Sequence, residues 1–401
     1  MRAPRISPWR FVVTFGVVSL LADLVYEGAR SVTGPLLASL GATAVVVGVV
    51  TGVGEAAALL LRLVSGPLAD RSQRFWAWTL AGYALTVISV PALGMAGTLG
   101  VAAALVITER VGKAIRSPAK DAMLSFATSA TGRGRGFAVH EALDQCGAVI
   151  GPLAVAAVLA ATGNHYGPSL AVLALPGVLA LALLVWLRSR ARDPQEFEPH
   201  PHGASTPATG TSPSPGVRGL PPVFWRYAAF TAITMTGFTT FGVLSFHLVT
   251  TEVLLPAAVP VLYAGVMVVD AVAALATGWA YDHLGAPVLA VLPVVAALIP
   301  VLSFTTSLPL VITGALLWGI GLGIQESTLR ATIADLVPTH RRGTAYGIFA
   351  AILGVATAAG GALSGALYQT SLALLIGLTI ALQLLALIAL TLTRAGHRVH
   401  D

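Results

Sequence analysis

Charged residues are scarce in this chain of 401 residues. Asp, Glu, Lys and Arg together make up 10% of it, whereas hydrophobic residues make up 56%. Soluble globular domains carry about 25% charged residues, and the mean hydropathy here is +0.83. The composition therefore excludes an ordinary soluble protein and is typical of a chain that crosses a membrane many times.

Cysteine is nearly absent as well, since Cys146 is the only one. This excludes a disulfide within the chain and any C-x-x-C metal or redox motif. The chain also lacks the G-x-S-x-G, P-loop and H-E-x-x-H motifs, so we expect no enzyme activity, no use of ATP, no cofactor and no bound metal. The net charge of +6 does not indicate a nucleic-acid partner, because the basic residues fall in particular loops.

Apolar runs near the length of a membrane span, about 20 residues, occur twelve times. The first six are Phe11–Leu40, Ala44–Ala69, Phe75–Ala96, Thr98–Ser117, Gly136–Ala161 and Pro168–Leu187. The second six are Val223–Val249, Pro256–Ala280, Pro287–Phe304, Leu308–Leu336, Gly343–Tyr368 and Leu372–Leu392. The first run is too long and too charged for a cleaved signal peptide, so we expect it to be retained.

A segment rich in Pro, Gly, Ser, Thr and His separates the two sets of spans and predicts a flexible cytoplasmic linker. The sequence thus predicts an all-α membrane protein with twelve transmembrane helices in two pseudo-symmetric halves of six. The boundaries are 1–188 for the first half, 189–222 for the linker and 223–401 for the second half.

Lys and Arg concentrate in alternate connections. They occur at the N-terminus, in the second, fourth, sixth and tenth connections and in the C-terminal tail; the odd-numbered connections contain none, and the eighth has only Asp282 and His283. By the positive-inside rule both termini are cytoplasmic, which requires an even number of spans. We expect a multi-pass protein of the bacterial inner (plasma) membrane that works as a monomer in the lipid bilayer.

Three charged residues stand inside the first span. Asp23, Glu27 and Arg30 are spaced so that a helix puts them on one face. A charge at mid-membrane costs roughly 2.5–3.5 kcal/mol on insertion scales, so this face is expected to look into the bundle or a wet cavity. A Glu27–Arg30 ion pair that fixes the helix is the structural alternative, and it leaves Asp23 unexplained.

The two halves repeat the same local patterns. Gly66-Pro-Leu-Ala-Asp70-Arg71-Ser-Gln-Arg74 ends the second span, and Gly278-Trp-Ala-Tyr-Asp282 ends the eighth. With the twelve spans and the linker, this loop resembles the G-x-x-x-D-R-x-G-R signature of the major facilitator superfamily, although Gln73 replaces the usual glycine. The resemblance covers essentially the whole chain. It implies transport by alternating access, with the first, fourth, seventh and tenth helices lining a central cavity.

Two further motifs resemble particular branches of that family. Gly147-Ala-Val-Ile-Gly151-Pro152 resembles the antiporter motif of the drug-efflux branches, but Leu153 and Ala154 replace the glycines that often complete it. Glu109-Arg110-Val-Gly-Lys113 resembles the motif with a membrane-embedded arginine. For Gly147–Pro152 ordinary helix packing is the alternative explanation.

A carboxylate in a partly desolvated cavity can bind and release a proton near neutral pH. Asp23 is the first candidate for this role, Glu27 the second, and Arg110 is the expected counter-ion of one of them. Glu109 and Asp144 are further candidates for proton coupling. Lys113 and Arg116 lie nearer the cytoplasm, where snorkelling to the interface explains them at least as well.

Other membrane-embedded side chains have weaker support. His140 and Glu141 are expected near the cytoplasmic gate, Glu55 and Asp270 are isolated acids, and Glu326–Arg330 is expected to be an ion pair, with cavity lining as the second explanation. The aromatic residues Phe238, Phe241 and Trp318 line an amphiphile pocket or only pack against lipid and helices. We expect the residues that gate the cycle to be Gly66, Asp70, Arg71, Arg74, Glu141, Gly147, Gly151, Pro152 and Asp282.

The sequence therefore predicts a proton-coupled secondary transporter that exports a small organic solute or drug by antiport. A proton symporter that imports a small solute, anionic solutes included, is the first alternative, and a membrane receptor or assembly protein without transport activity is the second. A metal or inorganic-ion carrier has oxygen ligands in Asp23 and Glu27, but no His, Cys or Met cluster joins them.

Overall fold

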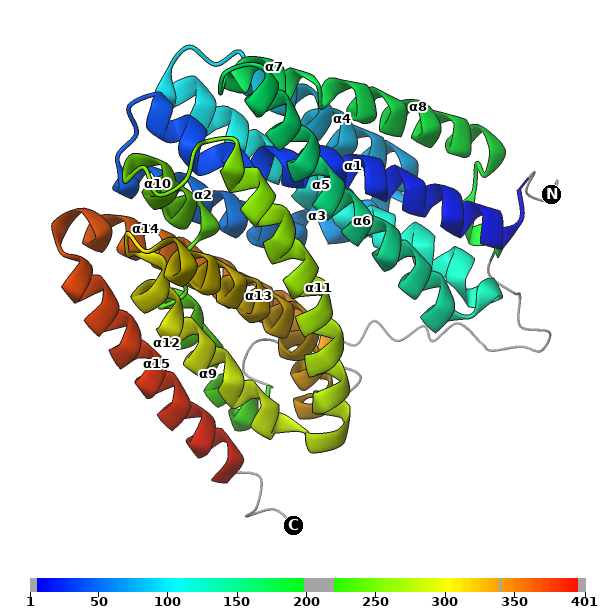
Figure 1. Ribbon diagram of the computed structural model, residues 1–401. Helices are drawn as coiled ribbons and strands as arrows, with labels where there is room; N and C mark the ends of the chain where they lie inside the picture. Colours follow the sequence, from blue (N-terminus) through cyan, green and yellow to red (C-terminus); the bar gives the residue numbers. More distant parts are fainter. Residues whose placement is uncertain (1–5, 198–219, 339–340, 396–401) are drawn as a thin grey trace.

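The computed structural model describes residues 6–197, 220–338 and 341–395, and they are almost entirely helical (Figure 1). The helices of the first half are α1 Pro8–Ser39, α2 Ala44–Leu60, α3 Arg62–Ser72, α4 Phe75–Leu93, α5 Leu99–Thr131, α6 Arg133–Ala161, α7 Tyr166–Ala171 and α8 Ala174–Arg190, followed by the turn η1 Pro194–Phe197. Those of the second half are α9 Pro222–Thr236, α10 Phe241–Thr250, α11 Ala258–Leu284, η3 Ala286–Ala290, α12 Val291–Ser303, α13 Leu308–Leu336, α14 Arg342–Thr370 and α15 Leu372–Ala395.

Eleven helical segments within the described residues are long and apolar enough to cross a membrane. Four of these segments join two neighbouring elements: α2 with α3, α7 with α8, α9 with α10, and η3 with α12. The twelfth span is α5, whose charged residues set it apart from the other eleven. The predicted all-helical fold with twelve spans is confirmed.

Two spans differ from the expected ranges. The fourth continues as helix α5 to Thr131, well beyond the expected end at Ser117, because Met123, Leu124 and Ala127 are buried against the first-half core. The seventh is broken between Thr236 and Phe241. Gly360 of α14 packs against the break, where a Cβ atom at Gly360 would lie 2.6 Å from the Met235 carbonyl oxygen. Broken helices are tolerated at membrane depth where the irregular backbone lines a cavity.

The two sets of six spans touch through small residues at one end. A Cβ atom at Gly48 of α2 would lie 2.1 Å from the Gly361 carbonyl oxygen of α14, and one at Gly34 of α1 would lie 2.3 Å from the Gly242 carbonyl oxygen of α10. Only glycine permits such an approach. Away from this end the helices of the first half, blue to green, diverge from the rest toward the ends that carry the termini (Figure 1).

The start of the segment expected to be a flexible linker is folded. Trp76 Nε1 donates a hydrogen bond of 3.0 Å to the Ala191 carbonyl oxygen, and the Phe197 ring is buried 5.1 Å from the Phe11 ring. Residues 191–197 are therefore folded and not part of a free linker, because Ala191 and Phe197 are buried in the first-half core. Residues 198–219 lie outside the described part of the chain.

Candidate functional site

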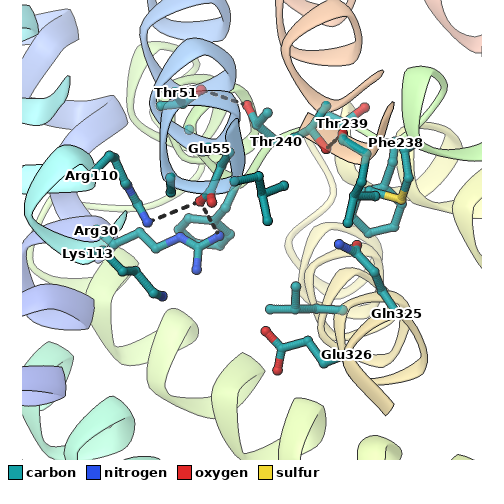
Figure 2. A pocket seen from close by; sticks show the side chains of 18 of the residues that line it. Arg30, Thr51, Glu55, Arg110, Lys113, Phe238, Thr239, Thr240, Gln325 and Glu326 are labelled. Atoms are coloured by element: carbon teal, nitrogen blue, oxygen red, sulfur yellow. Dashed lines mark hydrogen bonds and ion pairs between the residues drawn. The ribbon is translucent and has the colours of Figure 1, made fainter. Parts of the chain in front are cut away.

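A cavity of about 170 Å³ lies between the two sets of spans (Figure 2). It is lined by residues of the first, fourth, seventh and tenth spans, as expected, and also by residues of the second and eleventh. The break between α9 and α10 contributes Phe238, Thr239 and Thr240, and α10 continues the lining with Phe241 and Gly242. The cavity is therefore walled by both halves.

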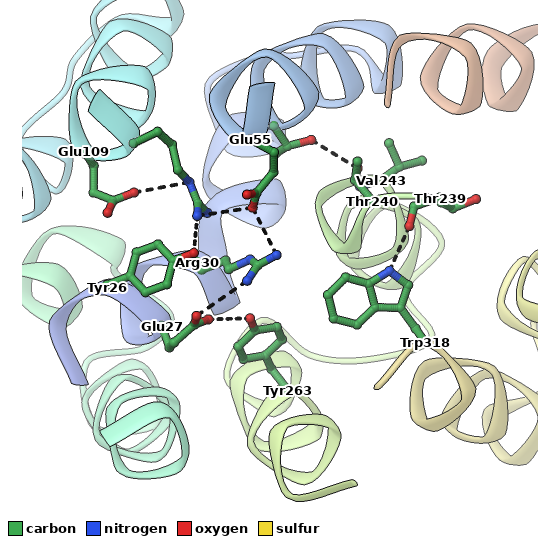
Figure 3. A network of polar contacts seen from close by, with 12 residues as sticks. Tyr26, Glu27, Arg30, Glu55, Glu109, Thr239, Thr240, Val243, Tyr263 and Trp318 are labelled. Atoms are coloured by element: carbon green, nitrogen blue, oxygen red, sulfur yellow. Dashed lines mark hydrogen bonds and ion pairs between the residues drawn. The ribbon is translucent and has the colours of Figure 1, made fainter. Parts of the chain in front are cut away.

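Glu55 of α2 stands at the centre of a charged network in this cavity (Figure 3). Its Oε1 lies 3.1 Å from Arg30 Nη2 and 3.2 Å from Arg110 Nη1. Arg30 also lies 3.5 Å from Glu27, and Arg110 lies 3.3 Å from Glu109. Glu55 is therefore no isolated acid, contrary to expectation, and the predicted Glu27–Arg30 pair is present.

Two tyrosines complete the network. Arg110 donates a hydrogen bond to Tyr26, and its guanidinium lies 4.5 Å from the centroid of that ring. Tyr263 of α11 donates a hydrogen bond of 2.5 Å to Glu27 Oε2 and so connects the two halves. Tyr26 was detectable in the sequence because it stands four residues before Arg30 on the charged face. No sequence pattern indicated a role for Tyr263, because its partner Glu27 lies in the other half of the chain.

Asp23 has a different counter-ion from the one expected. Its carboxylate lies 3.8 Å from Arg116 Nη2, whereas Arg110 pairs with Glu55 and Glu109. The reason is helix direction, because α5 packs antiparallel to α1. Asp23 lies about 10 Å before Arg30 along α1, and the α5 residue at the same height is therefore the later Arg116, whereas Arg110 lies at the height of Arg30.

Arg116 does not snorkel to the interface. It is buried, donates a hydrogen bond of 3.1 Å to Thr86, and lies 4.7 Å from the Tyr83 ring centroid. Lys113 lines the cavity, with its Nζ 4.0 Å from the Tyr26 ring centroid. Cation–π contacts and buried carboxylates replace the water that a snorkelling side chain would reach.

A second polar cluster lies on α6. Asp144 Oδ2 is 3.9 Å from Lys120 Nζ, and His140 Nε2 is 2.8 Å from Ser19 Oγ. Glu141 has a carboxylate oxygen within 4.8 Å of ligand atoms of both His140 and Asp144. Such a triad can hold a cation, but Lys120 already supplies a positive charge at Asp144, and a cation would have to displace it.

The second half contributes two acids. Asp270 of α11 is buried, and its Oδ1 has no hydrogen-bond partner among the described atoms. Glu326 of α13 lines the cavity. The Arg330 side chain lies outside the described part of the chain, so the expected Glu326–Arg330 pair stays a prediction.

The predicted aromatic residues lie on the cavity wall. Trp318 is buried beside Phe241, with ring centroids 5.4 Å apart, and beside Phe238, at 6.1 Å. Trp318 Nε1 donates a hydrogen bond of 2.8 Å to the Thr239 carbonyl oxygen in the helix break. The Arg30 guanidinium lies 5.8 Å from the Trp318 ring centroid. These three rings therefore face the cavity and each other.

The residues of the signature loop are exposed. Asp70, Arg71, Arg74 and Asp282 lie at the surface, and none of the ion pairs between described residues includes them. Gln73, which stands where the signature has glycine, has a φ of +52°. Glycine adopts this left-handed conformation at no steric cost, which explains the usual residue. Gln73 accepts a hydrogen bond of 2.5 Å from Gln195 at the start of the linker.

The glycines predicted to allow close packing divide into two groups. A Cβ atom at Gly147 would lie 2.2 Å from the Leu20 carbonyl oxygen, and one at Gly151 would lie 2.1 Å from that of Leu24, so α6 packs tightly on α1. Pro152 follows within the same continuous helix. At Gly66 the nearest atoms belong to Pro118 at 3.8 Å, an ordinary contact. Gly66 therefore makes no close helix contact in this arrangement of the helices.

A family comparison identifies this architecture. Residues 15–255 and 254–400 match the model of the Major Facilitator Superfamily. The chain belongs to this superfamily. It is therefore a multi-pass membrane transporter, as its apolar helices and central cavity indicate.

Three proteins similar to this chain show how far the resemblance extends in sequence and in structure. An uncharacterized protein of Mycobacterium tuberculosis H37Rv is 62% identical over 385 residues, which are 96% of this chain and 93% of the relative. An uncharacterized MFS-type transporter of Methanocaldococcus jannaschii is 23% identical over 90% of this chain and 89% of its own. The crystal structure of a point mutant of the nucleoside transporter NupG superposes with a TM-score of 0.75 at 11% identity, covering 94% of this chain and 99% of that one. At this identity the likeness shows the fold alone.

Proposed function

We propose that this superfamily member is a proton-coupled secondary active transporter that moves a small organic solute by alternating access. The main support for this proposal is the central cavity, where the carboxylate of Glu55 lies between the guanidinium groups of Arg30 and Arg110. Each charge at mid-membrane costs roughly 2.5–3.5 kcal/mol, so a set of charged residues in this cavity indicates a functional role. Buried charges facing a cavity also argue against a receptor that binds only at its outer surface.

The proposed roles follow the positions of the side chains. Asp23, Glu27, Glu109 and Asp144 are the proposed proton carriers. Arg30, Arg110 and Lys113 are their charge partners or bind solute, and Phe238, Phe241 and Trp318 contact its apolar part. The exposed loop of Asp70, Arg71 and Arg74 is proposed to form its contacts in the opposite conformation, in which the cytoplasmic ends of the halves come together.

Export by antiport is the direction that the Gly147–Pro152 motif favours. We place the protein in the bacterial inner membrane as a functional monomer, with both termini in the cytoplasm, because Lys and Arg concentrate in the connections on the terminal side. A second candidate is import of a small anionic solute by proton symport. It is favoured by the basic side chains that line the described part of the cavity, Arg30, Arg62, Arg110 and Lys113.

Reconstitution in proteoliposomes with an imposed pH gradient tests the proposal. Internal pH is read with a trapped dye while anionic, neutral and cationic solutes are added in turn. We expect at least one solute to move protons, and Asp23→Asn to abolish this movement while Glu252→Gln, an exposed loop acid, leaves it unchanged. If no solute moves protons, the proton-coupling proposal fails; if Asp23→Asn moves protons normally, Asp23 is not the proton carrier.

Right-side-out vesicles distinguish the two directions. Under antiport an inward proton gradient drives the solute out, whereas under symport it drives the solute in. Accumulation of solute with the gradient directed inward would overturn antiport and support the second candidate.

A further inference from the structure

The two walls of the central cavity differ in chemistry. Among the side chains that the structure describes, the basic residues that line it are Arg30, Arg62, Arg110 and Lys113, and all come from the first half. The second half contributes aromatic rings, hydroxyl groups, an amide and one acid: Phe238, Phe241, Trp318, Thr239, Thr240, Thr357, Gln325 and Glu326. Figure 2 shows Arg30, Arg110 and Lys113 on one side of the space, with Phe238, Gln325 and Glu326 across from them. A solute that complements both walls has a charged end and an apolar end.

One oxygen atom marks where the charged end would bind. Glu55 Oε1 receives Arg30 Nη2 at 3.1 Å and Arg110 Nη1 at 3.2 Å. Two guanidinium groups from different helices thus converge on a single carboxylate, which is how arginine binds organic acids and phosphates. The Glu55 side chain is also the most accessible of the three, at 26% exposed against 18% for Arg30 and 8% for Arg110. The anion site is therefore already occupied, by a side chain that faces the cavity.

We propose that Arg30 and Arg110 bind the anionic group of a small amphipathic organic anion, and that Glu55 holds this site until it takes up a proton. The inference rests on the proton-coupled transport proposed above and gives it a substrate class. A proton from water adds to the Glu55 carboxylate, the carboxylic acid no longer neutralises the two guanidinium groups, and they turn to the incoming anion. The apolar part of the anion then lies against Phe238 and Trp318.

The charge balance of the cavity supports this exchange. The basic groups facing Glu55 are Arg30 on α1, Arg110 and Lys113 on α5, and Arg62 on α3. The break before α10 and helix α14 line the same cavity with the uncharged Thr240, Leu353 and Thr357. Four carboxylates stand in or beside the same space: Glu27, Glu55, Glu109 and Glu326. A proton on Glu55 removes one negative charge from beside Arg30 and Arg110, and a bound monovalent anion restores it.

Proton and anion then bind together. Binding free energies are reciprocal, so if protonation of Glu55 strengthens anion binding, the anion raises the proton affinity by the same factor. Such mutual strengthening suits transport of both in one direction, which is the symport candidate. Antiport requires the opposite, that the two weaken each other.

Binding measured on the full-length protein in detergent tests the inference. The probe is benzenesulfonate, whose charge does not change between pH 5 and 9, compared with the neutral benzenesulfonamide and the cationic phenyltrimethylammonium; hexanesulfonate serves as a second anion without a ring. Affinity is measured by calorimetry from about pH 6 to 8, where single-proton linkage changes it by at most tenfold per pH unit. We expect the sulfonates to bind, more tightly as the pH falls, and the amide and the cation to bind at least tenfold more weakly.

Three variants make the test specific. Glu55→Gln mimics the protonated acid, so benzenesulfonate should bind to it tightly with little dependence on pH. Arg110→Lys keeps the charge but loses the forked donor, and at least tenfold weaker binding is expected. Arg188→Gln, an exposed arginine outside the cavity, should bind like the wild type. Thermal unfolding of each variant confirms that it is folded.

The outcomes separate this inference from the transport proposal. If neither sulfonate binds, if the cation binds better than the sulfonates, or if Glu55→Gln keeps the wild-type pH dependence, the inference is overturned. Proton movement with a neutral or cationic solute in proteoliposomes would then leave the transport proposal standing. Conversely, sulfonate binding with the predicted pH dependence but without any proton flux supports the anion site and contradicts proton-coupled transport.

Discussion

Tyr263 and Glu27 are 236 residues apart in sequence, yet the tyrosine hydroxyl donates a hydrogen bond of 2.5 Å to the Glu27 carboxylate. Glu27 in turn pairs with Arg30 at 3.5 Å, and Arg30 reaches Glu55 at 3.1 Å. A single chain of polar contacts therefore leads from the second half into the charged cavity of the first. Any motion that separates α1 from α11 must break it.

Removing this hydroxyl should shift the conformational equilibrium. Tyr263→Phe deletes a hydrogen bond to a charged group, worth about 1.5–3 kcal/mol, and we expect the arrangement described here to lose population roughly tenfold. Spin labels at Gly97 and Glu252, two exposed positions in connections on the side away from the termini, report the separation of the halves in a Cys146→Ser background.

Tyr281→Phe is the matched control for that experiment. Tyr281 also donates to a carboxylate, Asp335 at 2.9 Å, but both residues belong to the second half. Its loss should leave the distance distribution unchanged. Equal shifts in the two variants would show that the Tyr263 contact has no special role between the halves.

Close packing of α2 on α14 should be equally sensitive. Gly48→Ala places a Cβ atom 2.1 Å from the Gly361 carbonyl oxygen, and overpacking of this kind costs typically 1–3 kcal/mol. We expect the same spin labels to show the two halves moving apart at this end. Gly265→Ala, within α11 with nothing within 4 Å of the new Cβ, should produce no change in distance.

The Asp23–Arg116 pair should contribute to stability apart from any role in coupling. Asp23→Asn leaves the buried Arg116 without its carboxylate, and breaking a buried pair costs up to about 3–5 kcal/mol. Because the Asp23 side chain is 20% exposed, we expect a loss at the lower end, seen as a lower melting temperature in detergent. The double variant Asp23→Asn/Arg116→Gln should recover part of the loss; no recovery would show that the two charges are not coupled.

The folded start of the linker gives a prediction about packing. Phe197→Ala removes a buried ring that contacts Phe11, and such truncations cost about 3–5 kcal/mol. Resistance to unfolding by denaturing detergent should fall accordingly. Phe137→Ala, at a ring that is 39% exposed, should change it little, and similar losses in both would contradict the assigned packing.

Much of the fold was accessible from the sequence, because length and hydropathy decide which segments cross a membrane. The Glu27–Arg30 pair was predictable for the same kind of reason, since it depends only on helix periodicity. The partners of Asp23 and Glu55 were not. They depend on the relative height of neighbouring helices, which no local pattern encodes, and a shift of one helical turn of about 5.4 Å exchanges Arg110 for another cation.

The broken seventh span shows a second kind of limit. Nothing in Gly237-Phe-Thr-Thr240 requires a break, because a glycine within an apolar run is compatible with a continuous membrane helix. The interruption becomes favourable only when Gly360 packs against it and Trp318 takes up the Thr239 carbonyl group. These contacts belong to helices that lie far along the chain.

Trp318 donates its hydrogen bond to a main-chain carbonyl oxygen and not to a side chain. This affects how the solute selectivity of the cavity can change. The main chain offers the same acceptor whatever residue occupies position 239, so the indole ring keeps its place when Thr239 is replaced. Thr239 also faces the cavity. Substitutions at position 239, natural or designed, can therefore alter the polarity of this cavity wall while the Trp318 ring keeps its position.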